Sequence, residues 1–288
     1  MTRAHRSLQL ADLAMGLTHA PVSVRAKPAA ASTPAAAAPP QAKPPKPSTP
    51  PPSAPSVPVG QAPAPPPPST PPALRVTASW PPTGGVPTGR EARAAALEAL
   101  RDRHARECPH CTGSTSHTHL VFGEGDPTAR LMFVGEAPGE TEDRVGRPFV
   151  GRAGEKLDEM IRAMGLSREQ VYIANVLKSR PPENRTPLQH EVDGCGPFLI
   201  EQLLLVRPEV VVTLGGPATK LLLGTETGIT RLRGVWAAWN PPAGSGDPIP
   251  VMPTYHPAYL LRNYTPKTRG EVWSDLKAVM ERLGLAKA

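Results

Sequence analysis

Four short apolar runs predict buried β-strands in the part of the chain that follows residue 130. They are rich in valine, isoleucine and leucine, as expected of strands buried on both faces, and they span residues 131–134, 171–177, 210–214 and 250–253. Segments of helix-forming composition lie before, between and after them, at residues 91–106, 155–164, 188–206, 217–223 and 267–283. Strands that alternate with helices form parallel sheets covered on both faces. The pattern therefore predicts an α/β fold, a three-layer α/β/α sandwich with a four-stranded parallel sheet.

The first 90 residues do not follow this pattern. They contain 23 of the 40 prolines, set in long runs of alanine, serine and threonine. Such a composition buries too little apolar surface to offset the entropy of ordering the chain. We therefore expect residues 1–90 to be a disordered Ala/Pro-rich tail and residues 91–288 to form one folded domain.

The distribution of charge changes what the basic composition implies. The whole chain carries a net charge of +7, and residues 1–90 alone hold eight Lys or Arg and a single acidic residue. The folded part is therefore neutral, so any affinity for nucleic acid there must come from local patches, while the tail adds an attraction that is blind to sequence. Within the tail, residues 7–18 suit a short amphipathic helix. They are either a docking peptide for a replication or repair protein or a frayed terminus.

Membrane insertion and disulfide bonding are not expected. No apolar run reaches the roughly 20 residues of a membrane span, and the N-terminus lacks the features of a signal peptide. The three cysteines are an odd number, and two of them form the Cys-x-x-Cys pair Cys108 and Cys111. This usage is typical of a reducing, cytoplasmic compartment and of a metal or cluster site.

Polar side chains follow three of the predicted strands, where a parallel sheet places its ligands. Glu136 follows the first strand within a Gly/Pro-rich loop, Asn175 lies late in the second, and His256 follows the fourth. Phe149 lies in a loop beside the first strand and is one of four phenylalanines. Taken singly, these residues are also compatible with a loop carboxylate, a strand cap, a satisfied histidine and a lid on the core. Taken together, they predict a site at one edge of the sheet.

Five motifs then resemble the type-4, iron–sulfur uracil-DNA glycosylases. They are Gly-Glu-Ala-Pro-Gly at 135–139, Arg-Pro-Phe-Val-Gly-Arg-Ala-Gly at 147–154, Asn-Val-Leu-Lys at 175–178, Arg-Pro-Pro-Glu-Asn-Arg at 180–185 and His-Pro-Ala-Tyr-Leu-Leu-Arg at 256–262. The resemblance covers residues 92–285 in order. It implies that residues 91–288 are a catalytic domain that hydrolyses the N-glycosidic bond of deoxyuridine in DNA.

The resemblance also implies roles for the site residues. Phe149 stacks on a uracil rotated out of the duplex, and the Asn175 amide pairs with its edge. His256 hydrogen-bonds the base as negative charge builds on it, with help from backbone N–H groups near Ala137 and Gly139. Glu136 positions or deprotonates the attacking water.

Further matched positions concern DNA. Arg180, Arg185 and Arg262 are expected to touch phosphates, and Leu260 to touch DNA or fill the gap left by the base. The alternative for each arginine is a solvated surface charge.

The match fails at one ligand of the iron–sulfur cluster. The family uses four cysteines, and here Cys108, Cys111 and Cys195 fit three of these positions while Ser179 occupies the fourth. A serine hydroxyl ionises far less readily than a thiol and suits a soft iron less well. Three outcomes are open: a [4Fe–4S] cluster with serine or water on one iron, a cluster that is labile or loses that iron, or no cluster, with the cysteines free or bound to zinc with His110 or another residue.

Three other functions compete with that of a monomeric uracil-DNA glycosylase. The first is a catalytically weak protein that binds uracil or lesions in DNA on the same fold. A second, covalent trapping of uracil-DNA, needs an extra basic loop, whereas the Gly151–Gly154 segment runs directly into Glu155. A third, an unrelated metal hydrolase, lacks the His-x-x-x-His pair or acidic cluster that holds a catalytic ion.

Overall fold

The computed structural model describes residues 85–114, 117–242 and 245–285. The expected Ala/Pro-rich tail, residues 1–90, lies almost wholly outside these residues. The expected docking peptide, residues 7–18, lies wholly outside them. Among the described residues, no helix combines the length and apolar character that crossing a membrane requires.

The described chain contains one six-stranded sheet with the order β1-β3-β2-β4-β6-β5. Its four central strands are parallel and are those predicted from the apolar runs: β2 (Leu131–Gly135), β3 (Tyr172–Asn175), β4 (Val210–Leu214) and β6 (Ile249–Thr254). Two short antiparallel strands, β1 (Glu124–Gly125) and β5 (Ala237–Trp239), extend the two edges. The expected count of four strands is therefore corrected to six. Strands of two and three residues are too short to show an alternating pattern.

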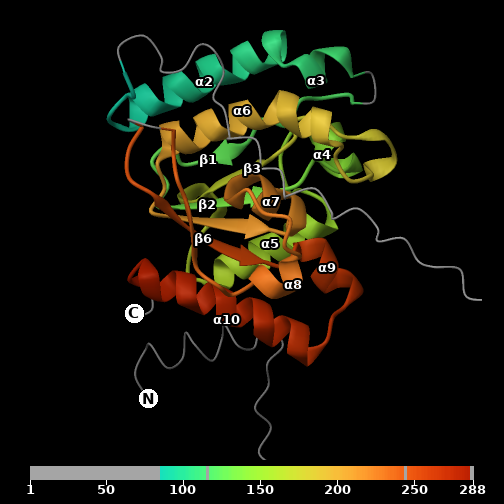
Figure 1. The fold of residues 1–288 in the computed structure, drawn as a ribbon, viewed down its shortest axis with the longest axis vertical. Coiled ribbons are helices and arrows are strands. Elements are labelled where there is room, and N and C mark those ends of the chain that lie inside the picture. The colour runs from blue at the N-terminus through green and yellow to red at the C-terminus, as the bar shows by residue number, and fades with distance from the viewer. Residues whose placement is uncertain (1–84, 115–116, 243–244, 286–288) are drawn as a thin grey trace, which may run out of the picture. The chain divides into compact units, whose positions relative to one another are not determined.

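Helices cover both faces of this sheet, as Figure 1 shows, which confirms the three-layer sandwich. On one face lie α2 (Arg90–Glu107), α3 (Pro109–Gly113), α6 (Gln189–Val206) and α7 (Gly216–Leu223). On the other lie α5 (Arg152–Ala163), α9 (Pro257–Arg262) and α10 (Pro266–Arg282). Shorter elements join the layers: α4 (Glu140–Val145), α8 (Ile229–Leu232) and two 3-10 helices, Arg168–Gln170 and Pro182–Asn184.

Alternate residues of each central strand divide the core into two halves. Met132 and Val134 of β2 belong to the cluster under α2 and α6, whereas Leu131 and Phe133 belong to the cluster under α5 and α10. All four side chains are almost fully buried. This is the pattern of a parallel strand with both faces covered, which explains why its sequence is uniformly apolar.

The register of the sheet brings the ends of the central strands to one edge. Gly135 pairs with Asn175 across β2 and β3, and Leu214 pairs with Thr254 across β4 and β6. Because parallel strands share their carboxyl edge, the residues that follow these pairs lie close to one another. Glu136 and His256 therefore come to the same edge as Asn175.

The edge strand β1 offers a test of this packing. Gly125 has φ +127°, and a Cβ atom there would lie 1.9 Å from the carbonyl oxygen of Val171. Gly125→Ala is expected to lower the free energy of unfolding by more than about 1 kcal/mol, because neither the backbone nor the space accepts a side chain.

Chemical denaturation followed by circular dichroism measures this change. The matched control is Gly270→Ala in α10, where a Cβ meets nothing within 4 Å. That substitution is expected to stabilise the protein by about 0.5–1 kcal/mol through helix propensity. Equal stabilities of the two variants would contradict the prediction.

Candidate active site and candidate metal centre

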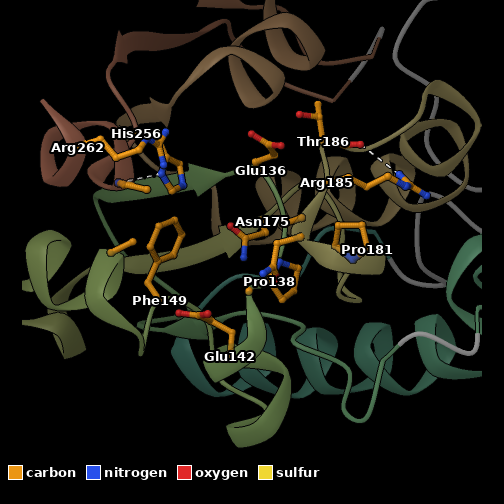
Figure 2. A pocket seen from close by; sticks show the side chains of 15 residues that line it. Glu136, Pro138, Glu142, Phe149, Asn175, Pro181, Arg185, Thr186, His256 and Arg262 are labelled. Atoms are coloured by element: carbon orange, nitrogen blue, oxygen red, sulfur yellow. Dashed lines mark hydrogen bonds between the residues drawn. The ribbon is translucent and has the colours of Figure 1, made fainter.

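A hollow of about 410 Å³ opens at the carboxyl edge of the sheet. Figure 2 shows the side chains of Phe149, Asn175, His256 and Glu136 around it. The sequence placed all four at this edge, and the structure brings them together in one pocket. The remaining lining residues are Ala137, Pro138, Gly139, Glu142, Ala153, Pro181, Asn184, Arg185, Thr186, Ala258 and Arg262.

Phe149 is held in the pocket in an unusual backbone conformation. Its φ is +50°, a left-handed value that is uncommon for a bulky residue, and its side chain is buried. Its ring centroid lies 5.6 Å from that of His256, with an angle of 33° between the planes. A Cβ on Gly135 would lie 2.5 Å from the Phe149 ring and 2.3 Å from Asn175 Oδ1. Only glycine at the end of β2 therefore allows the ring and the amide to lie so close together.

Two charged side chains hold the loop that carries Phe149. On one side, Glu142 Oε1 accepts hydrogen bonds from the backbone N–H groups of Val150 at 2.9 Å and Gly151 at 2.8 Å. On the other side, Arg168 donates to the carbonyl oxygen of Phe149 at 3.0 Å and to that of Pro148. A strained backbone conformation persists when several surrounding contacts hold it in place, and these hydrogen bonds supply that restraint.

Arg168 is itself fixed by acidic residues from two other elements. It forms ion pairs with Glu124 of β1 and, at 2.7 Å, with Asp158 of α5. Arg147 also binds Glu124, at 2.7 Å. The roles of Glu142 and Arg168 were not found from the sequence, because nothing local distinguishes either residue from its charged neighbours.

Asn175 presents an unsatisfied acceptor to the pocket. The residue is 1% exposed, and its Oδ1 atom is buried without a hydrogen-bond partner among the described residues. A buried polar atom left unpaired costs about 1–3 kcal/mol, so such an atom in a binding hollow points to a ligand that donates to it.

His256 is arranged as a neutral hydrogen-bond donor. It caps α9, and its Nδ1 atom accepts from the backbone N–H of Ala258 at 3.1 Å. A neutral imidazole that accepts at Nδ1 carries its proton on Nε2. Burial, helped by the charge of Arg262, lowers the pKa of His256 to about 4, so the ring is uncharged at neutral pH.

Glu136 is partly buried at the end of β2. Burial raises the pKa of its carboxyl group above the usual value, because the ionised form loses solvation. The backbone around it is fixed, since its carbonyl oxygen accepts from the N–H of Leu177 at 3.1 Å. A carboxylate with a raised pKa facing a pocket is a candidate general base.

The residues expected at the DNA surface fall into different environments. Arg262 is exposed and lines the pocket, and Arg185 lines it while forming a two-point ion pair with Glu191 at 2.8 Å. That pair holds the pKa of Glu191 at about 2. Arg180 donates to Asn184 Oδ1 at 2.8 Å and does not line the pocket.

Leu260 is corrected to a core residue. Its exposure is 0%, and it packs in the cluster beneath α5 and α10. The helical turn of α9 directs this position inward, so the side chain cannot reach DNA in this conformation. Its neighbour Leu261 is the partly exposed leucine of the segment.

The candidate metal centre lies between α2, α3 and α6. The ligand atoms of His104, Cys108, Cys111 and Cys195 all lie within 4.8 Å of one another, and all four side chains are buried. Cys111 Sγ lies 3.8 Å from Cys195 Sγ, which lies 3.5 Å from His104 Nε2. Contacts with the neighbouring thiols hold the pKa of Cys108 well below its usual range. Three converging sulfurs and an imidazole supply the donor types of a thiophilic metal centre, either a structural zinc ion or the iron–sulfur cluster of the resemblance.

Ser179 borders the same centre. Its Oγ atom lies 3.3 Å from Cys111 Sγ and 3.1 Å from His110 Nε2. His110 in turn lies near Glu191, with 3.9 Å between Nδ1 and Oε1. The hydroxyl therefore already has hydrogen-bond partners in the protein.

Lys178 joins the metal centre to the pocket. This lysine is fully buried, and its ammonium donates to the backbone carbonyl of Asn175 at 2.7 Å and to Gln202. Its backbone N–H donates to Cys195 Sγ at 3.2 Å. Burial lowers the pKa of Lys178 to about 8. One short segment after β3 thus contacts both sites.

Comparisons with known proteins agree with this geometry. The family model described as "Uracil DNA glycosylase superfamily" matches residues 122–277, more than half of the chain. Three curated proteins named "Type-4 uracil-DNA glycosylase" are similar to it. The one from Thermotoga maritima is 44% identical over 63% of this chain and 91% of its own length. Those from Sulfurisphaera tokodaii and Archaeoglobus fulgidus are 44% and 42% identical, over 64% and 65% of this chain and 84% and 95% of theirs.

The restraint on the Phe149 loop can be measured directly. Arg168→Met removes the donors to the carbonyl groups of Pro148 and Phe149, so the strained loop opens more often. Amide hydrogen exchange in a peptide that spans residues 147–151 is expected to be about 5-fold faster or more, since one lost hydrogen bond is worth about 1 kcal/mol.

Arg162→Met, at an exposed position of α5, is the matched control and is expected to exchange like the parent protein. Exchange in the loop that is unchanged by Arg168→Met would show that this arginine does not restrain it.

Proposed function

The chain belongs to the uracil-DNA glycosylase superfamily, and on this basis we propose that it excises uracil from DNA. It hydrolyses the N-glycosidic bond between uracil and deoxyribose and leaves an abasic site. The observation that carries this proposal is the unpaired Asn175 Oδ1 atom in a pocket that also holds an aromatic ring. A pyrimidine with a donor on its edge would satisfy that acceptor.

The base must leave the duplex to reach this pocket. A stacked uracil is out of reach of side chains at the bottom of a hollow, so the nucleotide is rotated out at a cost of a few kcal/mol. Phe149 offsets part of this cost by stacking on the extruded base. Its restrained backbone places the ring before the base arrives, so little ordering is needed on binding.

Asn175 selects uracil over cytosine. Uracil N3–H donates to Oδ1, while the amide Nδ2 donates to uracil O4. Cytosine lacks the N3 proton and carries an amino donor in place of O4, so both groups of Asn175 would face the wrong partner. Buried polar groups left unpaired are costly. A site whose polar groups pair only with the correct base therefore rejects the wrong base strongly.

His256 stabilises the departing base. With Nδ1 occupied by the Ala258 N–H, the Nε2 proton is available to donate to uracil O2, where negative charge grows as the bond breaks. The proposal assigns an assisting role to the backbone N–H groups of Ala137 and Gly139, because both residues line the pocket. A neutral histidine donates without first binding a proton, which suits a pKa of about 4.

Glu136 acts on the sugar side of the bond. Its carboxylate positions or deprotonates the attacking water, and its negative charge favours the positive character that develops on the deoxyribose ring. Both roles require the ionised form.

DNA is held by the basic groups near the pocket. Arg262 is free to contact phosphate at the rim, whereas Arg185 must share its guanidinium with Glu191. The basic residues of the 1–90 tail add a sequence-independent attraction. A monomeric state, a reducing cytoplasmic compartment and a partner protein for residues 7–18 remain predictions.

The metal centre has a structural role in this proposal. Cys108, Cys111 and Cys195 would hold an iron–sulfur cluster, of the [4Fe–4S] type in the resemblance, and such a cluster would cross-link α2, α3 and α6 rather than act on the base. Lys178 contacts both the Asn175 carbonyl and Cys195, so a group held by the cysteines would support the pocket through Lys178.

The pH dependence of uracil release tests Glu136. Its raised pKa means that the carboxylate becomes protonated at a higher pH than an ordinary glutamate. The rate constant for uracil release from an oligonucleotide is therefore expected to fall as the pH decreases through this raised pKa. His256 stays neutral until about pH 4 and does not change the rate above it. Glu136→Gln is expected to lose this acid limb and about 10²-fold or more of the rate.

Glu155→Gln on the exposed face of α5 is the control with the same change in charge. A Glu136→Gln variant that binds uracil-containing DNA and releases uracil at the parental rate would remove Glu136 from the mechanism. Parental protein that binds such DNA without releasing uracil would favour the binding protein over the enzyme.

The preference for uracil over cytosine tests the role of Asn175. Asn175→Asp replaces the Nδ2 donor by an acceptor, which repels uracil O4 and matches the amino group of cytosine. The ratio of uracil to cytosine release is expected to fall by about 10²-fold. Base release from matched oligonucleotides measures this ratio. Asn175→Ala, the control, is expected to lose uracil release without gaining cytosine release, and an unchanged ratio in Asn175→Asp would contradict the assignment.

A further inference from the structure

The metal centre has a fourth donor that the motif pattern does not contain. His104 lies in the last turn of α2, and Cys108 is the residue that caps the end of this helix, so the two are close along the chain. The side chain of His104 is fully buried, and its Nε2 atom lies 3.5 Å from Cys195 Sγ. With the three cysteines it forms a group of ligand atoms that lie within 4.8 Å of one another.

His104 is poorly explained as an ordinary core histidine. Its ring lies against Phe198 in an edge-on contact with 4.8 Å between centroids and against Phe122 at 5.9 Å. Within the described part of the chain, its buried Nδ1 atom has no hydrogen-bond partner. A buried imidazole usually has its polar atoms satisfied. Among the described residues, the polar contacts that place the ring are with the sulfurs of Cys195 and Cys108, and sulfur is a weak hydrogen-bond acceptor.

Ser179, which occupies the position of the missing cysteine, has a different environment. Its hydroxyl contacts His110 Nε2 at 3.1 Å and Cys111 Sγ at 3.3 Å, so it is already paired within the protein. A neutral hydroxyl oxygen is also a poorer ligand for a thiophilic metal than an imidazole nitrogen, which binds both iron and zinc.

We propose that His104 Nε2 is the fourth protein ligand of the metal centre, together with Cys108, Cys111 and Cys195. This inference rests on the part of the proposed function that places a metal here and does not depend on uracil excision. The substitution of serine for cysteine at 179 is thereby compensated from another helix. Ser179 keeps a hydrogen-bonding role beside the centre.

A donor set of three thiolates and one imidazole serves two kinds of centre. It completes the protein ligands of an iron–sulfur cluster, and it is also a common set for a structural zinc ion. Bonds of about 2.0–2.3 Å at tetrahedral angles place the ligand atoms of zinc roughly 3.5–3.8 Å apart. Two of the distances, 3.5 Å and 3.8 Å, match this spacing, and the whole group extends to 4.8 Å. A cluster of four irons would hold the same four groups further apart.

The ligand also ties α2 to the rest of the domain. Leu97 and Leu100 of this helix are buried against the core on the same side as His104. Leu97 and Leu100 anchor the middle of α2. A bond from His104 to a centre held by α3 and α6 would anchor its carboxyl-terminal end. Loss of the metal is therefore expected to loosen the carboxyl-terminal half of α2 first.

The experiment measures metal binding on the full chain, purified without oxygen. Elemental analysis identifies the centre, with about four irons expected for a [4Fe–4S] cluster or about one zinc for the single ion. Pulsed electron paramagnetic resonance then detects ligand nitrogen, on the reduced cluster or on cobalt exchanged for zinc. Parental protein carrying ¹⁵N-labelled histidine is expected to show a strongly coupled nitrogen. This measurement does not depend on the folding of any variant.

Variants assign that nitrogen. His104→Leu, of similar volume, is expected to lose the coupled nitrogen and to bind metal about 10-fold more weakly or worse. Ser179→Ala and His190→Leu, an exposed position of α6, are expected to keep both the nitrogen signal and the metal. Circular dichroism shows that each variant is folded.

Three results would overturn the inference. One is a metal-loaded parental protein without a strongly coupled histidine nitrogen. Another is retention of that signal and of the metal in His104→Leu together with their loss in Ser179→Ala, which would assign the ligand to the serine side of the centre. The last is parental protein free of iron and zinc. Because uracil release is assayed separately on the same sample, that result would leave the proposed excision activity standing.

Discussion

The site depends on the register between β2 and β3, which sets Gly135 directly opposite Asn175. A Cβ on Gly135 would overlap both the Asn175 amide and the Phe149 ring, at 2.3 Å and 2.5 Å. The absence of a side chain at this one position lets a hydrogen-bonding edge and a stacking surface lie within reach of the same flat ligand. A shift of one residue in the register would turn Asn175 away from the pocket. The buried apolar side chains of both strands, which fill two separate cores, prevent such a shift.

The stacking role proposed for Phe149 requires that its ring be held rigidly before a base binds. Phe149 adopts a left-handed backbone that costs of order 1 kcal/mol or more, and the loop keeps it through hydrogen bonds from both sides. Glu142 binds the N–H groups after Phe149, while Arg168 binds the carbonyl groups at and before it. Arg168 is anchored in turn by Glu124 and Asp158, so the ion pairs on the rim of the sheet stabilise the floor of the pocket. Surface charges that would contribute little to stability alone thus act on the geometry of the site.

Sequence patterns predicted the parts of this molecule in which a local rule decides the outcome. Apolar runs located the four central strands, and the shared carboxyl edge of a parallel sheet brought Glu136, Asn175 and His256 together. The edge strands β1 and β5 were missed because two or three residues are too few to show a strand pattern in the sequence. These strands form because their backbones hydrogen-bond to the neighbouring strands. Leu260 was misassigned because its motif does not say which face of α9 points inward. The contacts of Arg168 and His104 join residues far apart in the chain, and no spacing rule reveals such pairs.

The metal centre and the pocket meet in the segment that follows β3. Asn175 and Ser179 are four residues apart, and Lys178 between them contacts both regions. Its ammonium holds the Asn175 carbonyl, and its backbone N–H points at Cys195. Burial of the Lys178 ammonium is costly, and negative charge on the three nearby cysteines would offset part of this cost. The cysteines therefore need not touch the substrate to matter for its recognition. They contribute to the electrostatic environment of the buried Lys178, and Lys178 binds the carbonyl group of Asn175, whose side chain lines the pocket.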